Sequence, residues 1–404
     1  MAKKVLKFGG TSVGSVKRIA HAAKIVKKEQ DKGNKVIVIV SAMSGTTNDL
    51  INKSKKISED FSKSELDVLM SSGEQISSSL LAGAIIKLGI KARSWLGWQI
   101  PILTNNIHTS SQIMQIKTDE ILNFISHKGV AVIAGFQGIT EKNRITTLGR
   151  GGSDLSAVAI AKFFQTDSCD IYTDVDGVLT TDPSINEKAK KIDKISYEEM
   201  LEMSSLGAKV MQPSAVQTAM KNNIPVHVRS TFSEKHGTKI VSENDIEDKS
   251  VVTGITYSKK NAKVSIVGVV DKPGVAADVF EPIGENSINI DMVIQNTSLD
   301  GKNANITFTI KQEDLKKTLS IIEKNKKKID YKKVTHDDKL AKISIIGAGM
   351  IASPGVTHKM FRSLADEKIN ILAISTSEIK ISVLIREELT QKAVKTLHNT
   401  FGLN

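Results

Sequence analysis

The chain has 404 residues, which exceeds one compact core at about 100–200 residues per domain, so we expect two or three domains. Aromatic residues make up only 4%, and lysine supplies nearly all of the net charge of +12, which argues against a nucleic-acid-binding protein. The single cysteine, Cys169, excludes an internal disulfide and a cysteine-cluster metal site. No signal-peptide pattern and no run of 18 apolar residues occurs, so we expect a cytoplasmic protein with no membrane partner.

The first motif along the chain is a glycine-containing turn between a short apolar segment and a helix-like run at residues 16–28. It reads Lys7-Phe8-Gly9-Gly10-Thr11-Ser12. Glycines let backbone N–H groups approach an anion closely, the start of a helix adds positive dipole, and the lysine adds a charge. No G-x-x-x-x-G-K-[ST] pattern occurs, so we predict a phosphate-binding turn of a kinase without a P-loop.

Residues 1–245 alternate apolar strand patterns with helical ones. Continuous apolar runs, typical of strands buried on both faces, occur at 36–40 and 130–134, and two further strand patterns occur at 170–173 and 226–228. Helical patterns between them occupy 66–88, 153–164 and 197–203. This order predicts an α/β domain with a mostly parallel central sheet and helices on both faces. Ligands of such sheets collect at the carboxyl ends of the strands.

Further polar and glycine-rich clusters stand at predicted strand or helix ends. They are Ser41 to Thr47, Gly135-Phe136-Gln137, Ser72-Gly73-Glu74 at a predicted helix break, Thr147 to Asp154, and Tyr172 to Gly177. Each alone also fits a helix cap or a strand end. Together they supply anion cradles, an arginine suited to a carboxylate, and acids able to hold Mg²⁺ or orient an ammonium group. We therefore predict phosphoryl transfer to a small acidic substrate.

After a polar segment at 242–248 the chain repeats itself. Pro273-Gly274-Val275 matches Pro354-Gly355-Val356, and matching strand patterns flank both turns. Each copy reads as a ferredoxin-like βαββαβ module. We place the domain boundary between 245 and 246, the first copy at about 263–335, and the second at about 342–404 with an added strand at 251–257. Tandem small modules after an α/β domain suggest regulation.

These blocks resemble the signature motifs of aspartate kinases in the amino acid kinase superfamily, and the repeat resembles the tandem ACT domains of that family. The matching stretches are 7–12, 41–45, 73–74, 149–154, 173–177 and 207–209, with 289–292 and 374–379 in the repeat. The likeness covers nearly the whole chain. It implies transfer of the γ-phosphoryl group of ATP to the side-chain carboxylate of L-aspartate, giving 4-phospho-L-aspartate on the route to lysine, threonine, methionine and diaminopimelate.

The resemblance also implies site residues. The aspartate-binding set is Ser41, Thr47, Glu74, Arg150 and Ser153, with Arg150 on the α-carboxylate and Glu74 on the α-ammonium group. The ATP-binding set is Lys7, Phe8, Gly9, Gly10, Thr173, Asp174, Asp182 and Lys209. The catalytic set is Lys7, Glu74, Arg150 and Asp154, although Asp154 also fits a helix-start cap. Mg²⁺ is expected to arrive with ATP rather than at a metal site of the protein.

The ACT pair implies feedback inhibition by lysine, threonine or both, and a homo-oligomer, a dimer or tetramer, joined through these modules. The expected effector contacts are Asp271, Gly274, Ala276, Asn289, Ile290, Gln295, Thr357, Asn370, Ile371 and Ser377. Two alternatives stay open: a related kinase acting on acetylglutamate, glutamate, carbamate or UMP, and a non-enzymatic amino-acid sensor that kept the fold. No role is assigned to the segment 95–111.

Overall fold

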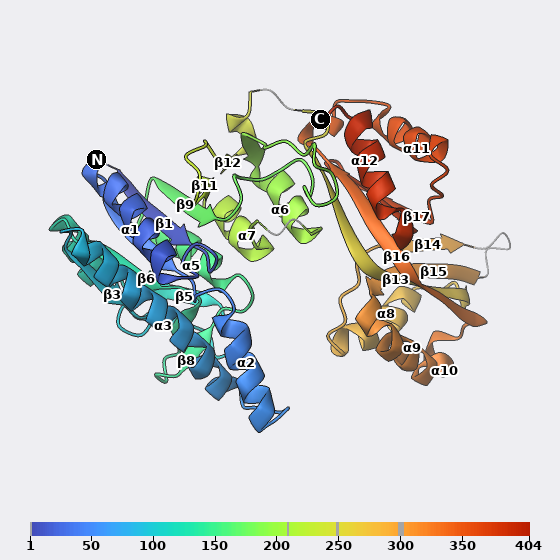
Figure 1. Cartoon of the computed structure of the whole chain (residues 1–404). Coiled ribbons are helices and arrows are strands. Elements are labelled where there is room, and N and C mark those ends of the chain that lie inside the picture. Colours follow the sequence, from blue (N-terminus) through green and yellow to red (C-terminus); the bar gives the residue numbers. More distant parts are fainter. Residues whose placement is uncertain (1, 208–209, 248–249, 298–302) are drawn as a thin grey trace. The chain divides into compact units, whose positions relative to one another are not determined.

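The computed structural model describes residues 2–207, 210–247, 250–297 and 303–404, which form two units (Figure 1). The first unit comprises the chain up to residue 180 together with 190–249. The second comprises 250–404 together with 181–189, a segment that lies within the predicted first domain. Among the described residues, no helix combines the length and the apolar character needed to cross a bilayer.

A mostly parallel eight-stranded sheet forms the centre of the first unit (Figure 1). Its strands are β1 (Lys3–Phe8), β2 (Lys35–Val40), β3 (Ala92–Trp95), β6 (Val130–Ala134), β9 (Ser168–Thr173), β10 (Lys194–Ser196), β11 (Val226–Ser230) and β12 (Thr238–Val241). They lie in the order β10-β12-β11-β9-β1-β2-β6-β3, and β11 and β12 pair antiparallel. The predicted α/β class is confirmed, because the β-branched runs are strands buried on both faces.

Helices cover both faces of this sheet. They are α1 (Val16–Asp31), α2 (Thr46–Ile57), α3 (Lys63–Lys87), α4 (Asp119–Ser126), α5 (Gly152–Phe163), α6 (Tyr197–Ser205) and α7 (Pro213–Lys221). Helices α1 and α3 pack on one face, where Leu6, Phe8 and Val38 join a continuous core. Helix α5 contacts β1 and β9. Side chains of β1 alternate between the two faces of the sheet, so Lys7 points away from the face of Leu6 and Phe8. Its ion pair with Asp154 of α5 therefore places α5 on the opposite face.

Helix α3 runs without interruption through Gly73, so the predicted helix break at 72–74 is wrong. The glycine has a packing role instead. A Cβ atom at Gly73 would lie 2.8 Å from the Cβ of Ala42, closer than two carbon atoms can approach. The absence of a side chain therefore lets α3 lie directly against the loop that follows β2.

A second, four-stranded sheet in this unit has no counterpart in the sequence analysis. Its strands are β4 (Ile102–Thr104), β5 (Ile113–Ile116), β7 (Gln137–Ile139) and β8 (Ile145–Thr147), in the order β5-β4-β7-β8. Strands of three or four residues are too short to show an alternating pattern. Of the segment 95–111, which had no predicted role, residues 102–104 form the strand β4 of this sheet.

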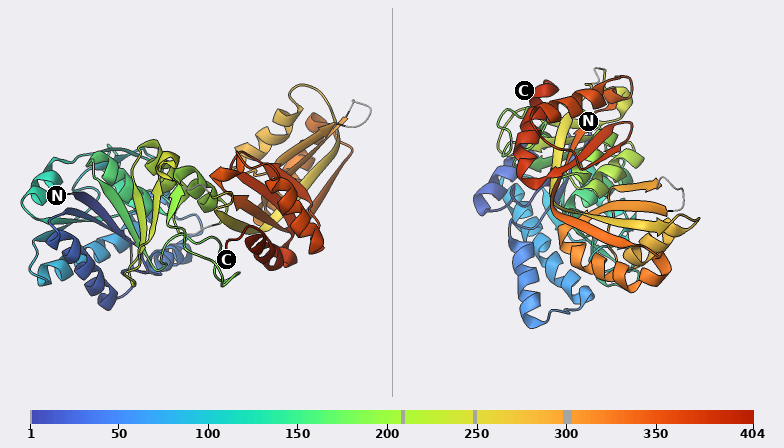
Figure 2. Two further views of the ribbon diagram at one scale, coloured as in Figure 1. Left: turned by 90° about the horizontal axis from the view of Figure 1, so that it is seen from above. Right: turned by 90° about the vertical axis from the view of Figure 1, so that its right-hand side faces the viewer.

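In the second unit both copies of the repeat share one antiparallel sheet (Figure 2). Its strands are β13 (Gly254–Val270), β14 (Val293–Thr297), β15 (Asn303–Lys311), β16 (Lys333–Ile346), β17 (Ala373–Thr376) and β18 (Lys380–Arg386), in the order β14-β15-β13-β16-β18-β17. Residues 254–258 of β13 pair with 342–346 of β16, in the second copy, and 261–267 pair with β15, in the first. The two modules are thus joined through the long strands β13 and β16.

The helices of the second unit complete two separate cores. They are α8 (Val275–Glu285), α9 (Leu315–Lys324), α10 (Lys326–Ile329), α11 (Val356–Asp366) and α12 (Thr390–Thr400). One core contains α8 and α9, and the other contains α11 and α12. Each copy therefore buries its own apolar face, and the predicted pair of ferredoxin-like modules is confirmed.

Candidate active site

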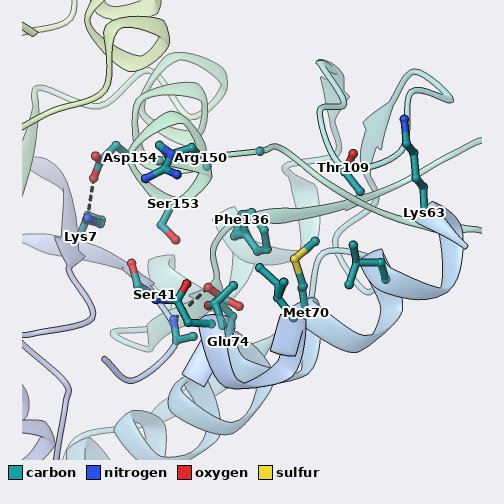
Figure 3. Close-up of a pocket in the computed structure, with 18 of the residues that line it drawn as sticks. Lys7, Ser41, Lys63, Met70, Glu74, Thr109, Phe136, Arg150, Ser153 and Asp154 are labelled. Carbon is teal, nitrogen blue, oxygen red and sulfur yellow. Dashed lines mark hydrogen bonds and ion pairs between the residues drawn. The ribbon is translucent and has the colours of Figure 1, made fainter. Parts of the chain in front are cut away.

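A cavity of about 640 Å³ opens in the first unit at the carboxyl ends of β1 and β2 (Figure 3). Its walls come from the ends of these strands, from α2 and α3, and from the loop that leads into α5. Seven residues predicted from the sequence line it together: Lys7, Ser41, Thr47, Glu74, Arg150, Ser153 and Asp154. The site thus lies where ligands of parallel sheets bind.

A buried ion pair forms one end of the cavity (Figure 3). Lys7 is the second-last residue of β1, and its Nζ atom lies 2.5 Å from Oδ1 of Asp154. Both residues are less than a tenth exposed, and a charge buried in this way needs a partner. Asp154 also stands in the first turn of α5, where the helix dipole favours a negative charge. The N-cap position of α5 is occupied by Gly151, and no side chain makes a capping bond there, so the interpretation of Asp154 as a helix-start cap is wrong.

Glu74 is a buried carboxyl group on α3 that is only half satisfied. Its Oε1 atom accepts a hydrogen bond from the backbone N–H of Ala42 at 2.9 Å, whereas no described residue donates one to Oε2. Burial raises its pKa from the ordinary value of 4.5 to about 7, against the opposing effect of the Ala42 N–H. The group is thus prepared to receive a cationic partner from a ligand.

Arg150 lies in the loop between β8 and α5. The loop turns sharply because Gly151, with φ of 70°, adopts the left-handed conformation directly before the helix. Arg150 is exposed and makes no ion pair with any described residue. Ser153, in the first turn of α5, is 7% exposed. A guanidinium group without a partner, beside a hydroxyl and a helix start, is suited to binding a carboxylate.

The glycine turn and the end of β9 lie side by side at the same edge of the sheet. The backbone N–H of Gly9 donates to the carbonyl of Tyr172 at 3.1 Å, and Phe8 pairs with Tyr172 across the two strands. Thr173 and Asp174 follow directly, and Asp174 is exposed. Phe8 stacks on the Tyr172 ring and is fully buried, and its carbonyl accepts a bond from the Ser41 N–H at 3.1 Å.

Two other predicted ATP contacts have different surroundings. Asp182 lies in the segment 181–189 of the second unit, where its Oδ2 atom accepts a hydrogen bond from the Tyr257 hydroxyl at 2.9 Å. Its Oδ1 atom accepts from the backbone and the hydroxyl of Ser184. Lys209 lies outside the described residues.

Some residues lining the cavity were not assigned to the site by the sequence analysis, among them Lys63, Met70 and Thr109. Nothing distinguishes Lys63 from the many surface lysines. Phe136 belongs to a cluster noted in the sequence, and it adopts a left-handed φ of 68°, which is costly for an aromatic residue. In the part of the chain that the structure describes, no group of three or more His, Cys, Asp or Glu side chains could hold a metal ion.

Most of the predicted effector contacts form pairs at equivalent positions of the two repeat modules, whereas Asp271, Gln295 and Ser377 have no predicted counterpart. Gly274 and Gly355 each precede a helix, α8 and α11, and both have φ of 94°. The remaining contacts surround these turns or lie at the edge strands β14 and β17: Asp271, Ala276, Asn289, Ile290, Gln295, Thr357, Asn370, Ile371 and Ser377.

Two family models match separate parts of the chain. The model of the amino acid kinase family matches residues 2–230, and that of the ACT domain matches 264–325 and 343–401. An aspartate kinase of Stutzerimonas stutzeri is 46% identical over 405 aligned residues, covering 100% of this chain and 98% of the relative.

Solved structures share the fold across its full length. E. coli aspartokinase III in complex with aspartate and ADP (R-state) superposes with a TM-score of 0.82 at 24% identity, covering 98% of this chain and 99% of that one. The same enzyme in complex with lysine and aspartate (T-state) gives a TM-score of 0.75 at 24% identity, with 98% and 99% covered.

The raised pKa of Glu74 predicts that this residue destabilises the ligand-free protein. A carboxyl group with a higher pKa in the folded state binds protons more tightly there, so its stabilising effect is lost as pH rises from 4.5 through 7. Glu74→Gln keeps the bond from Ala42 and removes the charge. It should raise the free energy of unfolding by up to about 3 kcal/mol at pH 8 and by much less at pH 5.

Urea unfolding of both proteins at pH 5 and pH 8 measures this difference. Glu65→Gln is the matched control on the same helix, because Glu65 is exposed and should change stability by less than about 0.5 kcal/mol. A Glu74→Gln protein that is less stable than the original at pH 8 would contradict the account.

Proposed function

Because the chain belongs to the amino acid kinase family and is an aspartate kinase, we propose that it converts L-aspartate and Mg·ATP to 4-phospho-L-aspartate and ADP. This reaction is the first step toward lysine, threonine, methionine and diaminopimelate, and we propose a cytoplasmic location, where both substrates occur. One observation carries the proposal: a single cavity presents an unpaired arginine, a half-satisfied buried carboxylate and a buried lysine.

Aspartate has three charged groups, and the cavity offers a side chain of opposite charge for each of them. Arg150 binds the α-carboxylate, assisted by the Ser153 hydroxyl and the start of α5. Glu74 binds the α-ammonium group through its free Oε2 atom, with Ser41 and Thr47 nearby. The side-chain carboxylate is then directed toward Lys7. Because this nucleophile is ionised at neutral pH, with an ordinary pKa of about 3.9, no general base is required.

Catalysis therefore consists of positioning and charge stabilisation. Lys7 neutralises the negative charge that develops on the phosphoryl group during transfer. Asp154 holds the Lys7 ammonium group in place through the ion pair of 2.5 Å. The N–H group of Gly10 and the side chain of Lys209 are proposed to assist at the phosphates, with Mg²⁺ carried by the nucleotide. The N–H of Gly9 already donates to the Tyr172 carbonyl, so Gly9 is proposed to contribute by its lack of a side chain, which lets the nucleotide approach closely.

The remaining ATP contacts are proposed at the adjacent strand ends, around Phe8, Thr173 and Asp174. No ATP contact is proposed for Asp182, because its carboxylate and its carbonyl already accept bonds inside the second unit, from Tyr257, Ser184, Ile185 and Asn186. The aspartate and ADP complex of E. coli aspartokinase III, which shares this fold, supports the two-substrate arrangement.

The ACT modules are proposed to bind an end-product amino acid, lysine or threonine or both, at the Gly274 and Gly355 turns. The lysine complex of E. coli aspartokinase III supports lysine as one effector. A homo-oligomer is proposed to form through the edge strands β14 and β17, which expose Val293 and Ile374. Inhibition then requires that the effector binds one global state more tightly than the other.

Arg150→Ala tests the substrate assignment. Losing a charge-assisted contact should raise the KM for aspartate about 10- to 100-fold and change the KM for ATP little. ADP release coupled to NADH oxidation measures both constants. The same assay is run with acetylglutamate, glutamate, carbamate or UMP in place of aspartate. Arg144→Ala is the matched control, because Arg144 lies just before β8 and pairs with Glu65 on the surface. An unaltered aspartate KM would reject the Arg150 role, and absent turnover with aspartate would reject the function.

Effector binding is tested in the same assay by titrating lysine and threonine separately and together. At least one of the three conditions should inhibit ADP release. Gln295→Ala should weaken the inhibition, whereas Asn296→Ala, on the opposite side of the same exposed strand, should retain it. Full activity with both amino acids at saturation would overturn the proposed regulation.

A further inference from the structure

Asp67 is a fully buried carboxylate on α3 that the proposed chemistry does not use. It precedes Glu74 by seven residues, which is two helical turns, so both side chains lie on one face of the helix. Burying a carboxylate is costly unless hydrogen-bond donors surround it. The groups that donate to Asp67 therefore show which segments this side chain holds in place.

Three residues satisfy Asp67: His108 and Thr109, in the segment between β4 and β5, and Thr147, at the end of β8. The hydroxyl of Thr147 donates to Oδ1 at 2.5 Å. The backbone N–H of Thr109 lies 3.1 Å from each carboxylate oxygen. Nδ1 of His108 lies 2.7 Å from Oδ2. One side chain thus joins α3 to two segments that are far apart in the sequence.

These two segments are also bonded to each other. Ser111 donates from its backbone N–H and from its hydroxyl to the carbonyl of Thr147, both at 2.9 Å. Gly149 packs so closely on this loop that a Cβ atom there would lie 3.2 Å from the Thr109 carbonyl oxygen. Thr147 is the last residue of β8, and Arg150 follows three residues later. The position of Arg150 therefore depends on the attachment at Thr147.

We propose that Asp67 is a positioning residue for the amino-acid substrate: it fixes the loop of Arg150 to the same helix that carries Glu74. The inference rests on the proposed roles of Arg150 and Glu74. Helix α3 then sets the separation between the group that binds the α-carboxylate and the group that binds the α-ammonium. Thr109, held by Asp67, lines the same cavity.

The test compares two neighbouring buried threonines of β8. Thr147 donates to Asp67, whereas the Thr146 hydroxyl pairs with that of Thr104 at 2.6 Å, and both threonines are fully buried. Thr147→Val should raise the aspartate KM about five- to tenfold with the ATP KM nearly unchanged, and Thr147→Ser should restore it. Thr146→Val loses a comparable bond and should leave the aspartate KM unchanged.

Asp67→Asn provides a second measurement. It should raise the aspartate KM in the same way, and adding Thr147→Val should have little further effect, because both changes act on one attachment. Equal effects of Thr146→Val and Thr147→Val, or no effect of Thr147→Val, would overturn the inference. If Arg150→Ala raises the aspartate KM while Thr147→Val does not, the inference fails and the proposed function stands.

Hydrogen exchange keeps the test independent of turnover. Thr147→Val should speed amide exchange in residues 105–111 and 148–152 of the intact chain, whereas Thr146→Val should not. Unchanged exchange in both segments would contradict the attachment even if the protein proved inactive with aspartate, in which case the proposed function would fail separately.

Discussion

The architecture of the site depends on charges that are buried at the end of a hydrophobic sheet. The chain must remove Lys7, Glu74 and Asp154 from water, and such burial is costly unless each charge has a partner. Lys7 and Asp154 satisfy each other across β1 and α5, whereas Glu74 has one backbone donor and a raised pKa. Among the described residues, the Glu74 carboxylate thus has no cationic partner, and the ammonium group of a ligand can become that partner when it binds.

Helix α3 transmits this arrangement to the rest of the cavity. Gly73 lets the helix lie against the loop after β2, which brings the Ala42 N–H to Glu74. Two turns earlier, Asp67 holds the segments that contain Thr109 and Thr147. The site lies at the carboxyl ends of the strands, and helix α3 sets the distance between the groups that line it. The ACT unit has its own sheet and cores, consistent with a separate regulatory role.

The features predicted from the sequence were those with a strong local signal. The runs at 36–40 and 130–134 are apolar because both of their faces are buried, and Arg150 stands among glycines that mark an unusual turn. The small sheet was missed because its strands are too short to show a period. Lys63 and Asp67 were missed because a single lysine or aspartate has no distinguishing neighbours, and their roles arise only from tertiary contacts. The break expected at Gly73 was wrong because its packing partner is distant in sequence.

The central claim is that the buried Glu74 carboxylate receives the ammonium group of aspartate. Calorimetric titration of the intact protein with aspartate, in buffers of different ionisation enthalpy, measures the protons that binding releases. With a pKa of about 7, Glu74 is half protonated at pH 7, so binding should release about half a proton per site. The release should vanish in Glu74→Gln. An absence of proton release at pH 7, or an equal release from Glu74→Gln, would contradict the account.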